Sequence, residues 1–256
     1  MEFDLDRLAV VMPAYNEAEG LPGFLEELHR ALSPLARRLD LVVVDDRSTD
    51  ATAEVVRGQA ARLPGLTVIE AETNRGHGPT ALAAYRAGLA LEPDLIVHVD
   101  GDGQFHGIDL ARAVRAAVAT DADVVHGVRR GRDDPWFRRV LTAMVGVVVA
   151  VAAGQGVPDV NTPLRVYKPA RLAELLELVP DDALVPHVHF SIAECRRGFR
   201  VRYVEVASLP RRGSNQTGTM WGVERRPKLP PKRLRRFARE AAAELWQVSL
   251  RPGAGR

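Results

Sequence analysis

Two aspartates and a glutamine stand close together in the segment VDGDGQFHG: Asp100, Asp102 and Gln104. Alternate residues that leave a strand point to the same side, so both carboxylates can face one spot. Two close carboxylates repel each other unless a cation lies between them. Because the set consists of hard oxygen ligands, it favours Mg²⁺ or Mn²⁺ over Zn²⁺. The alternative is a solvent-exposed turn, since Asp and Gly are common turn formers. The strongly apolar run before the segment and the helical pattern after it favour the metal site.

Two further polar segments follow short apolar runs: PAYNE at residues 13–17 and DDRSTD at residues 45–50. Their carboxylates can accept hydrogen bonds from ribose hydroxyls or from the N–H edge of a base. The structural alternative for the second segment is a helix cap, which Asp50 or Ser48 can supply. Asp45 and Asp46 lie too early in the chain to cap the next helix, which favours a ligand role for at least one of them. The first segment lacks G-x-G-x-x-G, so a dehydrogenase-type dinucleotide site is disfavoured.

The order of the elements explains why these segments would meet. Apolar runs expected to be strands alternate with helical patterns. The expected strands are 8–12, 41–44, 66–70, 94–99 and 123–128, and the expected helices are 21–39, 51–62, 79–91 and 109–119. Strands that are apolar on both faces and separated by helices are typical of a parallel sheet covered on both sides. The sequence therefore predicts an α/β fold with a mainly parallel central sheet, and open α/β sheets bind ligands at the carboxyl ends of their strands.

The second half of the chain is less regular. The segment Trp136–Val157 is mostly apolar, and 140–157 contains no charged residue over 18 positions. This length is the lower edge for a membrane span, but the composition is dominated by Ala, Gly and Val. A helix packed on the sheet is expected. A helix lying at a membrane surface, anchored by Trp136 and Phe137, stays an intermediate option. Further helices are expected at 172–178, 187–196 and 232–250, and a strand at 200–206.

Charge is distributed unevenly along the chain. The net charge is +2, yet residues 196–239 hold 14 Lys and Arg against 2 Glu. An acidic body with a basic tail indicates a tail that meets an anionic partner, and the alternative is an ordinary solvated helix.

A single cysteine, Cys195, excludes an intramolecular disulfide and a cysteine metal cluster. The start MEFDLDRLAV lacks the features of a secretory signal, so a cytoplasmic location is expected. With 5% aromatic residues and no stacking motif, nucleic-acid binding is disfavoured.

Four motifs occur together in a characteristic order: VVMPAYNE, VVVDDRSTD, the N-x-G-x-G of Asn74–Gly78, and DGDGQ. In this order and spacing they resemble the family 2 inverting glycosyltransferases, which have the Rossmann-like GT-A fold. Within that family the chain is most similar to polyprenyl-phosphate sugar transferases of the dolichol-phosphate mannose synthase type. The resemblance extends over residues 8–218.

The resemblance implies roles for particular residues. The nucleotide-sugar pocket would be lined by Pro13, Ala14, Tyr15, Glu17, Asp45, Asp46 and Asp100, and the metal set would be Asp100, Asp102 and Gln104. Arg129 and Arg139 would face phosphate as catalytic cations. The family's D-x-T-S-G-F-R segment reads DVNTPLR at Asp159–Arg165, and its R-x-x-G-x-S-K segment is matched only loosely at residues 211–215. From these segments the expected acceptor-phosphate contacts are Arg165, Arg211, Arg212 and Ser214, because bidentate Arg suits phosphate.

The expected reaction is transfer of mannose or glucose from a nucleotide diphosphate sugar, GDP-mannose or UDP-glucose, to a polyprenyl phosphate. A cation on Asp100 and Asp102 would neutralise the leaving diphosphate. A phosphate acceptor needs no strong base, whereas a hydroxyl acceptor would, and Asp159 is then the candidate. Residues 1–222 would form one catalytic domain, with a nucleotide-binding half (1–130) and an acceptor-binding half (131–222). Residues 223–256 would form a basic linker and helix at the inner face of the cell membrane. A soluble acceptor and a non-enzymatic anion-binding module are the alternatives.

Overall fold

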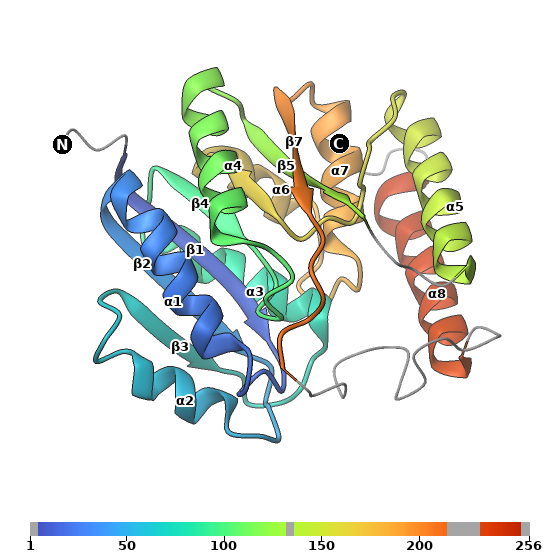
Figure 1. Cartoon of the computed structure of the whole chain (residues 1–256). Coiled ribbons are helices and arrows are strands. Elements are labelled where there is room, and N and C mark those ends of the chain that lie inside the picture. The colour runs from blue at the N-terminus through green and yellow to red at the C-terminus, as the bar shows by residue number, and fades with distance from the viewer. Residues whose placement is uncertain (1–4, 132–135, 214–230, 252–256) are drawn as a thin grey trace.

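A computed structural model describes residues 5–131, 136–213 and 231–251, and its centre is a seven-stranded sheet with the order β3-β2-β1-β4-β6-β5-β7 (Figure 1). The strands are β1 Leu5–Ala14, β2 Ala36–Asp45, β3 Leu66–Glu70, β4 Leu95–His98, β5 Val124–Arg130, β6 Arg165–Tyr167 and β7 Val201–Ala207. Only β6 runs against its neighbours, pairing antiparallel with both β4 and β5. The mainly parallel α/β sheet predicted from the sequence is confirmed.

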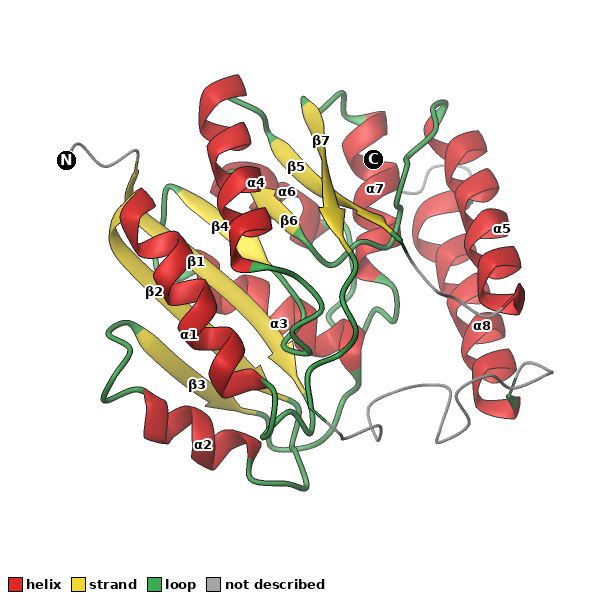
Figure 2. Cartoon of the chain, viewed as in Figure 1, coloured by secondary structure: helices red, strands yellow, loops and turns green. Residues whose placement is uncertain are grey.

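Helices cover both faces of this sheet (Figure 2). They are α1 Leu21–Leu32, α2 Thr52–Gln59, α3 His77–Leu89, α4 Gly107–Thr120, α5 Trp136–Ala153, α6 Pro169–Glu177, α7 Pro186–Arg196 and α8 Lys232–Leu245. Two short turns, Ser33–Leu35 (η1) and Trp246–Leu250 (η2), follow α1 and α8. Helices α1, α2 and α4 pack on one face, and α3, α6 and α7 on the other.

The alternation of side chains along β1 shows how the sequence produces this arrangement. Leu8, Val10 and Met12 belong to the core beneath α1 and α4, whereas Ala9 and Val11 belong to the core beneath α3. Successive strand residues point to opposite faces, so a continuous apolar run is buried on both sides.

Several boundaries differ from those predicted. The helix expected over 21–39 ends at Leu32, where Ser33 and Pro34 begin the tighter turn η1, and β2 starts already at Ala36. Strand β6 was not predicted, because its three residues are too short to carry a periodic signal.

The apolar segment after residue 136 forms α5, but the prediction that it packs on the sheet is wrong. Its inner side joins a separate small core, in which Val149 of α5 meets Val188 and Ile192 of α7 and Leu245 of α8. This core lies at the end of the sheet that holds β5 and the edge strand β7 (Figure 1). Within the described ranges, no helix has the length and apolar character needed to cross a membrane.

Candidate functional site

The polar segments predicted to bind ligand lie together where the parallel strands end. Backbone hydrogen bonds join them: Asp46 N donates to Ala14 O at 2.9 Å, and Gly101 N donates to Pro13 O at 3.1 Å. Asn16, held at φ 56, accepts a hydrogen bond from Thr49 N at 2.8 Å with its side-chain Oδ1. The segments after β1, β2 and β4 therefore form one connected edge.

Asp100 and Asp102 supply two carboxylates to this edge. The Oδ1 atom of Asp100 is buried and has no hydrogen-bond partner among the described residues, although His77 Nε2 lies 3.6 Å away. Burial raises the pKa of Asp102 to about 7, and the neighbouring Asp100 carboxylate adds to this rise. Such a pair is electrostatically unfavourable on its own, and a divalent cation would relieve it. In the part of the chain that the structure describes, no group of three or more His, Cys, Asp or Glu side chains is arranged to hold a metal ion.

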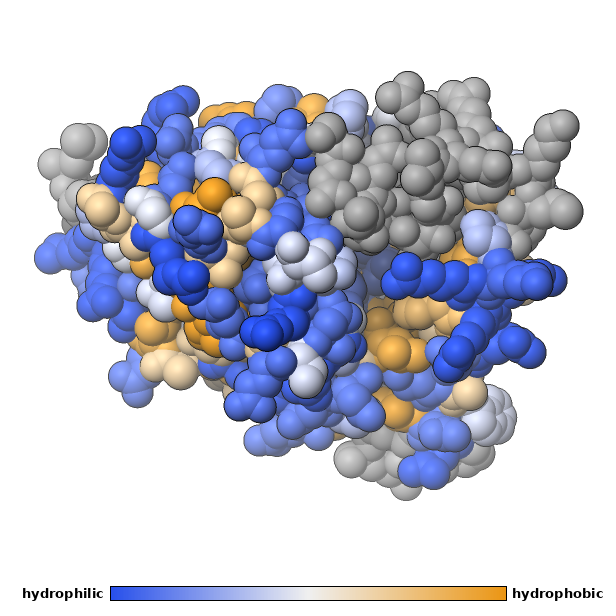
Figure 3. Space-filling view, turned by 90° about the horizontal axis from the view of Figure 1, so that it is seen from below, coloured by the Kyte–Doolittle hydropathy of each residue, from blue (hydrophilic) through white to orange (hydrophobic). Residues whose placement is uncertain are grey.

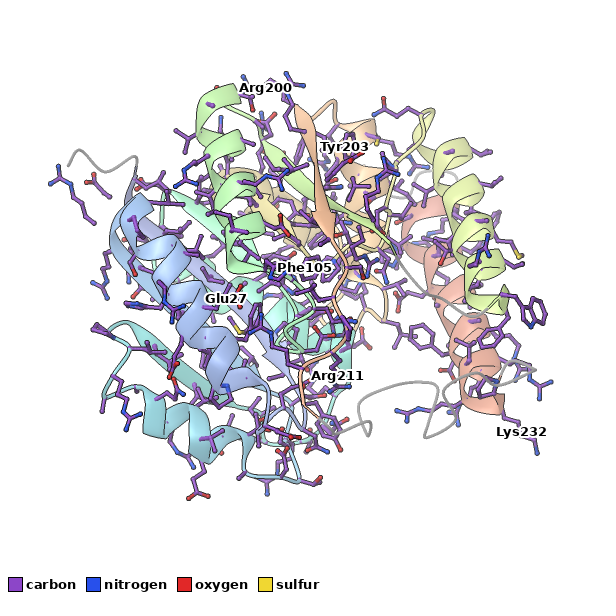
Figure 4. All side chains as sticks on the ribbon, in the orientation of Figure 1. Glu27, Phe105, Arg200, Tyr203, Arg211 and Lys232 are labelled. Atoms are coloured by element: carbon purple, nitrogen blue, oxygen red, sulfur yellow. The ribbon has the colours of Figure 1, made fainter. Side chains whose placement is uncertain are left out.

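Glu17 and Arg211 form an ion pair next to these carboxylates. Arg211 Nε donates to Glu17 Oε2 at 3.2 Å, and its Nη2 contacts the other oxygen. Burial raises the pKa of Glu17 to about 7, against the opposing effect of Arg211. Arg211 lies at the lower end of the sheet (Figure 4), so the segment after β7 reaches the same edge as the loop after β1.

Arg212 ties the same segment to α1 and to the aspartate loop. Its Nε donates to Gly103 O at 3.1 Å, its Nη2 pairs with Glu27, and its guanidinium lies 5.0 Å from the Phe24 ring centroid. Gly103 has φ +68, and a Cβ there would lie 2.5 Å from Arg212 Cδ, so this crossing favours glycine. Glu27 was not predicted, because a single Glu on a helix carries no distinguishing signal.

Gln104 also contacts the segment after β7. Its Nε2 donates to Leu209 O at 3.1 Å, and its backbone carbonyl accepts a hydrogen bond from Leu209 N at 3.0 Å. The amide therefore links two loops, and its role as a metal ligand stays a prediction.

The two aspartates after β2 have different surroundings. Asp45 accepts a hydrogen bond from Ser48 N at 3.0 Å, which closes the turn that begins DDRSTD. Asp46 accepts from Arg75 N at 2.8 Å and from Gly76 N at 2.9 Å, and so holds the N-x-G-x-G loop against the sheet edge. Both carboxylates are buried.

Arg129 and Asp159 form a second, separate pair. Arg129 Nε and Nη2 donate to the two Asp159 oxygens at 2.8 and 2.9 Å, and the guanidinium also reaches Asn161 O. Only 11% of the Arg129 side chain and 6% of the Asp159 side chain are exposed. The bidentate pair links the end of β5 to the loop before β6.

Arg165 does not lie where an acceptor phosphate could reach it, so that prediction is wrong. It is fully buried and donates to the carbonyl oxygens of Val160 and Thr162 and to Glu194 Oε1 at 3.2 Å. Arg165 begins the antiparallel strand β6, which was not predicted from the sequence. In this strand the Arg165 side chain points inward, beneath α7.

The remaining predicted residues are placed as follows. Pro13 and Ala14 are buried at the end of β1, Tyr15 is half-buried, and Arg139 is exposed on the first turn of α5. Ser214 lies outside the described residues.

Sequence comparisons place this chain among known enzymes. The family model of glycosyl transferase family 2 matches residues 9–200. The undecaprenyl-phosphate 4-deoxy-4-formamido-L-arabinose transferase of Edwardsiella ictaluri is 30% identical over 199 residues, which cover 77% of this chain and 60% of that protein. The transferase of the same name from Serratia proteamaculans is 31% identical over 183 residues, covering 71% of this chain and 55% of the relative. The chain thus spans somewhat more than half the length of these relatives.

The fold is similar to that of glucosyl-3-phosphoglycerate synthase from Mycobacterium tuberculosis, solved in complex with Mn²⁺ and UDP-glucose. The TM-score is 0.66 at 18% identity, and the match covers 98% of this chain and 81% of that one. A second structure of the same synthase, with phosphoglyceric acid, gives the same TM-score of 0.66. The shared motifs, the GT-A fold and the family match agree, and the chain belongs to glycosyl transferase family 2.

Proposed function

We propose that this chain is an inverting glycosyltransferase that moves mannose or glucose from a nucleotide diphosphate sugar to a polyprenyl phosphate with the help of Mg²⁺ or Mn²⁺. The observation that carries the proposal is the Asp100–Asp102 pair: a buried carboxylate oxygen that accepts no hydrogen bond from the described residues, next to a carboxylate whose pKa is raised to about 7. The pair stands at the carboxyl ends of a parallel sheet in a chain of this family.

Asp100 and Asp102 would hold the cation, and Gln104 is the further candidate ligand. The bound cation supplies positive charge for the departing diphosphate. The donor set fits this role, because both residues offer hard oxygen atoms and the site has an excess of negative charge. The Mn²⁺ and UDP-glucose in the mycobacterial synthase support the same assignment.

Pro13, Ala14, Tyr15 and Glu17 after β1 would line the nucleoside pocket. Asp45 and Asp46 after β2 would approach the base. Arg211 pairs with the Glu17 carboxylate. Because Glu17 would line the nucleoside pocket, the Arg211 guanidinium lies at the edge of that pocket, where it could also bind a phosphate of the donor or of the acceptor. Arg212 and Ser214, further along the same segment, are the other candidates for the acceptor phosphate.

The Arg129–Asp159 pair favours a phosphate acceptor over a hydroxyl acceptor. Both Asp159 oxygens accept hydrogen bonds from Arg129, so an incoming hydroxyl would have to displace the guanidinium to reach this base. A phosphate acceptor is already anionic and needs positioning more than deprotonation. Arg129 would supply positive charge to an acceptor phosphate by exchanging Asp159 for it, and Arg139, exposed on the first turn of α5, would add to that charge. The undecaprenyl phosphate in the names of the relatives supports this acceptor class.

The first test is ligand binding. The melting temperature is measured with GDP-mannose, UDP-glucose, GDP and UDP, each with Mn²⁺ or with EDTA. A ligand that binds only the folded chain raises the melting temperature by mass action. We expect a rise with one nucleotide series, in the presence of Mn²⁺ only. No rise with any nucleotide would contradict the donor assignment.

The second test is the acceptor. The stabilising donor, labelled in its sugar, is incubated with a short-chain, water-soluble prenyl phosphate and, in parallel, with 3-phosphoglycerate. We expect label on the prenyl phosphate. Label on 3-phosphoglycerate alone would replace the lipid-phosphate acceptor with a soluble one, the chemistry suggested by the name of the structural neighbour.

We propose that the enzyme acts in the cytoplasm, at the inner face of the cell membrane, because a polyprenyl acceptor is confined to the bilayer.

A further inference from the structure

The first turn of α3 lies in close contact with the segment that joins α6 to α7. A Cβ atom at Gly78 would lie 2.1 Å from Ala183 O and 2.7 Å from Leu184 O. Both of these atoms belong to the backbone, so neither can turn aside as a flexible side chain would. The close approach of two backbones therefore explains the second glycine of the N-x-G-x-G loop.

The loop that ends at Gly78 carries His77 to the carboxylate site. One side of this loop is fixed by Asp46, which accepts hydrogen bonds from two of its backbone amides. His77 Nε2 lies 3.6 Å from Asp100 Oδ1. The loop is thus held between Asp46 and the segment before α7, and a displacement of that segment would move His77 relative to Asp100.

The segment before α7 is held in turn by Glu244 of α8. This carboxylate accepts hydrogen bonds from Leu184 N at 2.8 Å, from Val185 N at 3.3 Å and from His189 Nε2 at 2.9 Å. Val185 precedes the first residue of α7, so the carboxylate lies at the amino-terminal end of that helix, where the helix dipole favours a negative charge. Leu184 therefore faces Gly78 with its carbonyl oxygen and binds α8 with its amide.

Helix α8 lies outside residues 9–200, which match the family model. Seen from below, long hydrophilic side chains project from the part of the molecule that holds this helix (Figure 3), and Lys232 of its first turn is labelled at the lower side in Figure 4. On the inner side of α8, Leu245 enters the small core with Val188 and Ile192. This inner side thus brings an apolar contact and the adjacent Glu244 carboxylate to α7.

We propose that Glu244 is a positioning residue of the donor site, which holds the segment before α7 against Gly78. It thereby keeps the N-x-G-x-G loop in place beside Asp100. The inference rests on the proposed function and deepens it, because it makes α8 a part of the structure that binds the nucleotide diphosphate sugar. Glu244 acts through backbone contacts in series, and the alternative is that it serves only to attach α8.

The test compares nucleotide affinity with stability in the full chain. Isothermal titration calorimetry gives the dissociation constants of GDP and of UDP, each with Mn²⁺, and the melting temperature is measured without nucleotide. The variants are Glu244→Ala, Glu244→Gln, Gly78→Ala and the combination of Gly78→Ala with Glu244→Ala. The matched control is Leu234→Ala, which truncates a buried side chain of the same helix at the end remote from Glu244.

We expect Glu244→Ala to weaken binding of the recognised nucleotide by about tenfold, because small displacements of positioning elements are costly at such sites. Glu244→Gln should bind almost as the wild type does, since its amide oxygen still accepts from the backbone. Leu234→Ala should lower the melting temperature and leave the dissociation constant unchanged. In sugar transfer to the short-chain prenyl phosphate, Glu244→Ala should raise the KM for the donor but not for the acceptor.

The combined variant tests whether the two residues act through one segment. Gly78→Ala alone should also weaken nucleotide binding, because the added methyl group pushes against the carbonyl groups of Ala183 and Leu184. When Glu244→Ala releases that segment, it can move away from the methyl group. The combined loss of affinity should therefore be smaller than the product of the two single losses.

The inference is overturned if Glu244→Ala lowers the melting temperature but keeps the wild-type dissociation constant, since Glu244 would then only attach α8. Single losses that multiply in the combined variant would overturn it as well, because the two positions would then be independent. Failure of the wild type to bind either nucleotide is a different result, and it would contradict the proposed donor itself.

Discussion

Asp102 is held in an environment that opposes its own ionisation. Burial and the neighbouring Asp100 raise its pKa to about 7, while a hydrogen bond from Gln104 N at 3.1 Å keeps its Oδ1 in place. A structural carboxylate would normally gain a cationic partner inside the protein, as Asp159 does from Arg129. The arrangement is therefore better explained by a ligand that brings positive charge from outside.

Replacing this carboxylate tests that explanation. Asp102→Asn should lower kcat/KM by about 10³-fold, because the cation that stabilises the leaving diphosphate is lost. The increase in melting temperature with Mn²⁺ and nucleotide should disappear as well. Asp6→Asn, an exposed carboxylate distant from the site, is the control and should behave as wild type. Full turnover by Asp102→Asn with the metal chelated would remove the metal from the proposal.

At the scale of elements, β6 is a short antiparallel strand that organises the loop before it. Arg165 at its start donates to Val160 O at 2.7 Å and to Thr162 O at 3.1 Å, and thereby shapes the loop that carries Asp159. The same guanidinium pairs with Glu194 of α7, which also lies 2.9 Å from His126 Nε2 on β5. One buried ion cluster thus joins two strands, a helix and a loop.

Arg165→Met should destabilise the fold by about 3–5 kcal/mol, because it leaves the buried Glu194 without its arginine and the loop carbonyls without donors. Combining it with Glu194→Gln should recover part of the loss, since the uncompensated charge is then removed. Urea denaturation measures both variants. Arg115→Met on the exposed side of α4 should change the free energy of unfolding by less than about 0.5 kcal/mol. A similarly small effect of Arg165→Met would show that the cluster contributes little.

The Glu244 carboxylate attaches helix α8 to the body of the protein, through Leu184, Val185 and His189. Burial acts against ionisation of Glu244, but the hydrogen bonds from His189 and the amides of Leu184 and Val185 lower its pKa overall. Glu244→Ala should cost about 1–3 kcal/mol, because two partly buried amides and an imidazole lose their acceptor. Hydrogen exchange should rise in α8 before it rises in the sheet. Glu240→Ala on the exposed side should cost no more than about 0.5 kcal/mol, and equal effects of the two changes would contradict the docking role.

The elements that were predicted correctly are those with a repeated signal. Strand β3 has the predicted bounds, and the runs that became β1, β2, β4 and β5 were identified because both faces of each are apolar. Arg165 was misassigned because three-residue strands have no periodicity, and only the pairing of β6 with β4 and β5 reveals which way its side chain points. Helix α5 was misplaced for a related reason. Its apolar composition indicates burial, but which surface buries it depends on α7 and α8, which come later in the chain.

At the scale of the whole molecule, two sets of buried groups act in opposite directions on its stability as pH changes. Burial lowers the pKa of His98 to about 4, and the pKa values of His126 and His187 are lowered as well, also through burial. In the unfolded chain these imidazoles take up a proton near pH 6.5, whereas in the folded chain they stay neutral to lower pH. Their contribution to the free energy of unfolding is therefore complete above pH 6.5 and is lost as pH falls toward the pKa values of the folded chain. Glu17 and Asp102 have raised pKa values of about 7, so the folded chain binds their protons more readily and gains stability as pH falls through 7.

Removing one member of each set should therefore change the pH profile in opposite ways. Asp102→Asn should be more stable than the wild type by up to about 4 kcal/mol at pH 8, where the buried charge is present, and the difference should vanish near pH 4. His98→Asn should lose less stability than the wild type between pH 6.5 and pH 4, by up to about 1.4 kcal/mol per pH unit for the proton no longer taken up on unfolding. The free energy of unfolding, measured in urea at a series of pH values with EDTA, gives both profiles. Parallel curves for the wild type and both variants would mean that neither group is perturbed by the fold, and the electrostatic argument for a cation at Asp100 and Asp102 would lose its main support.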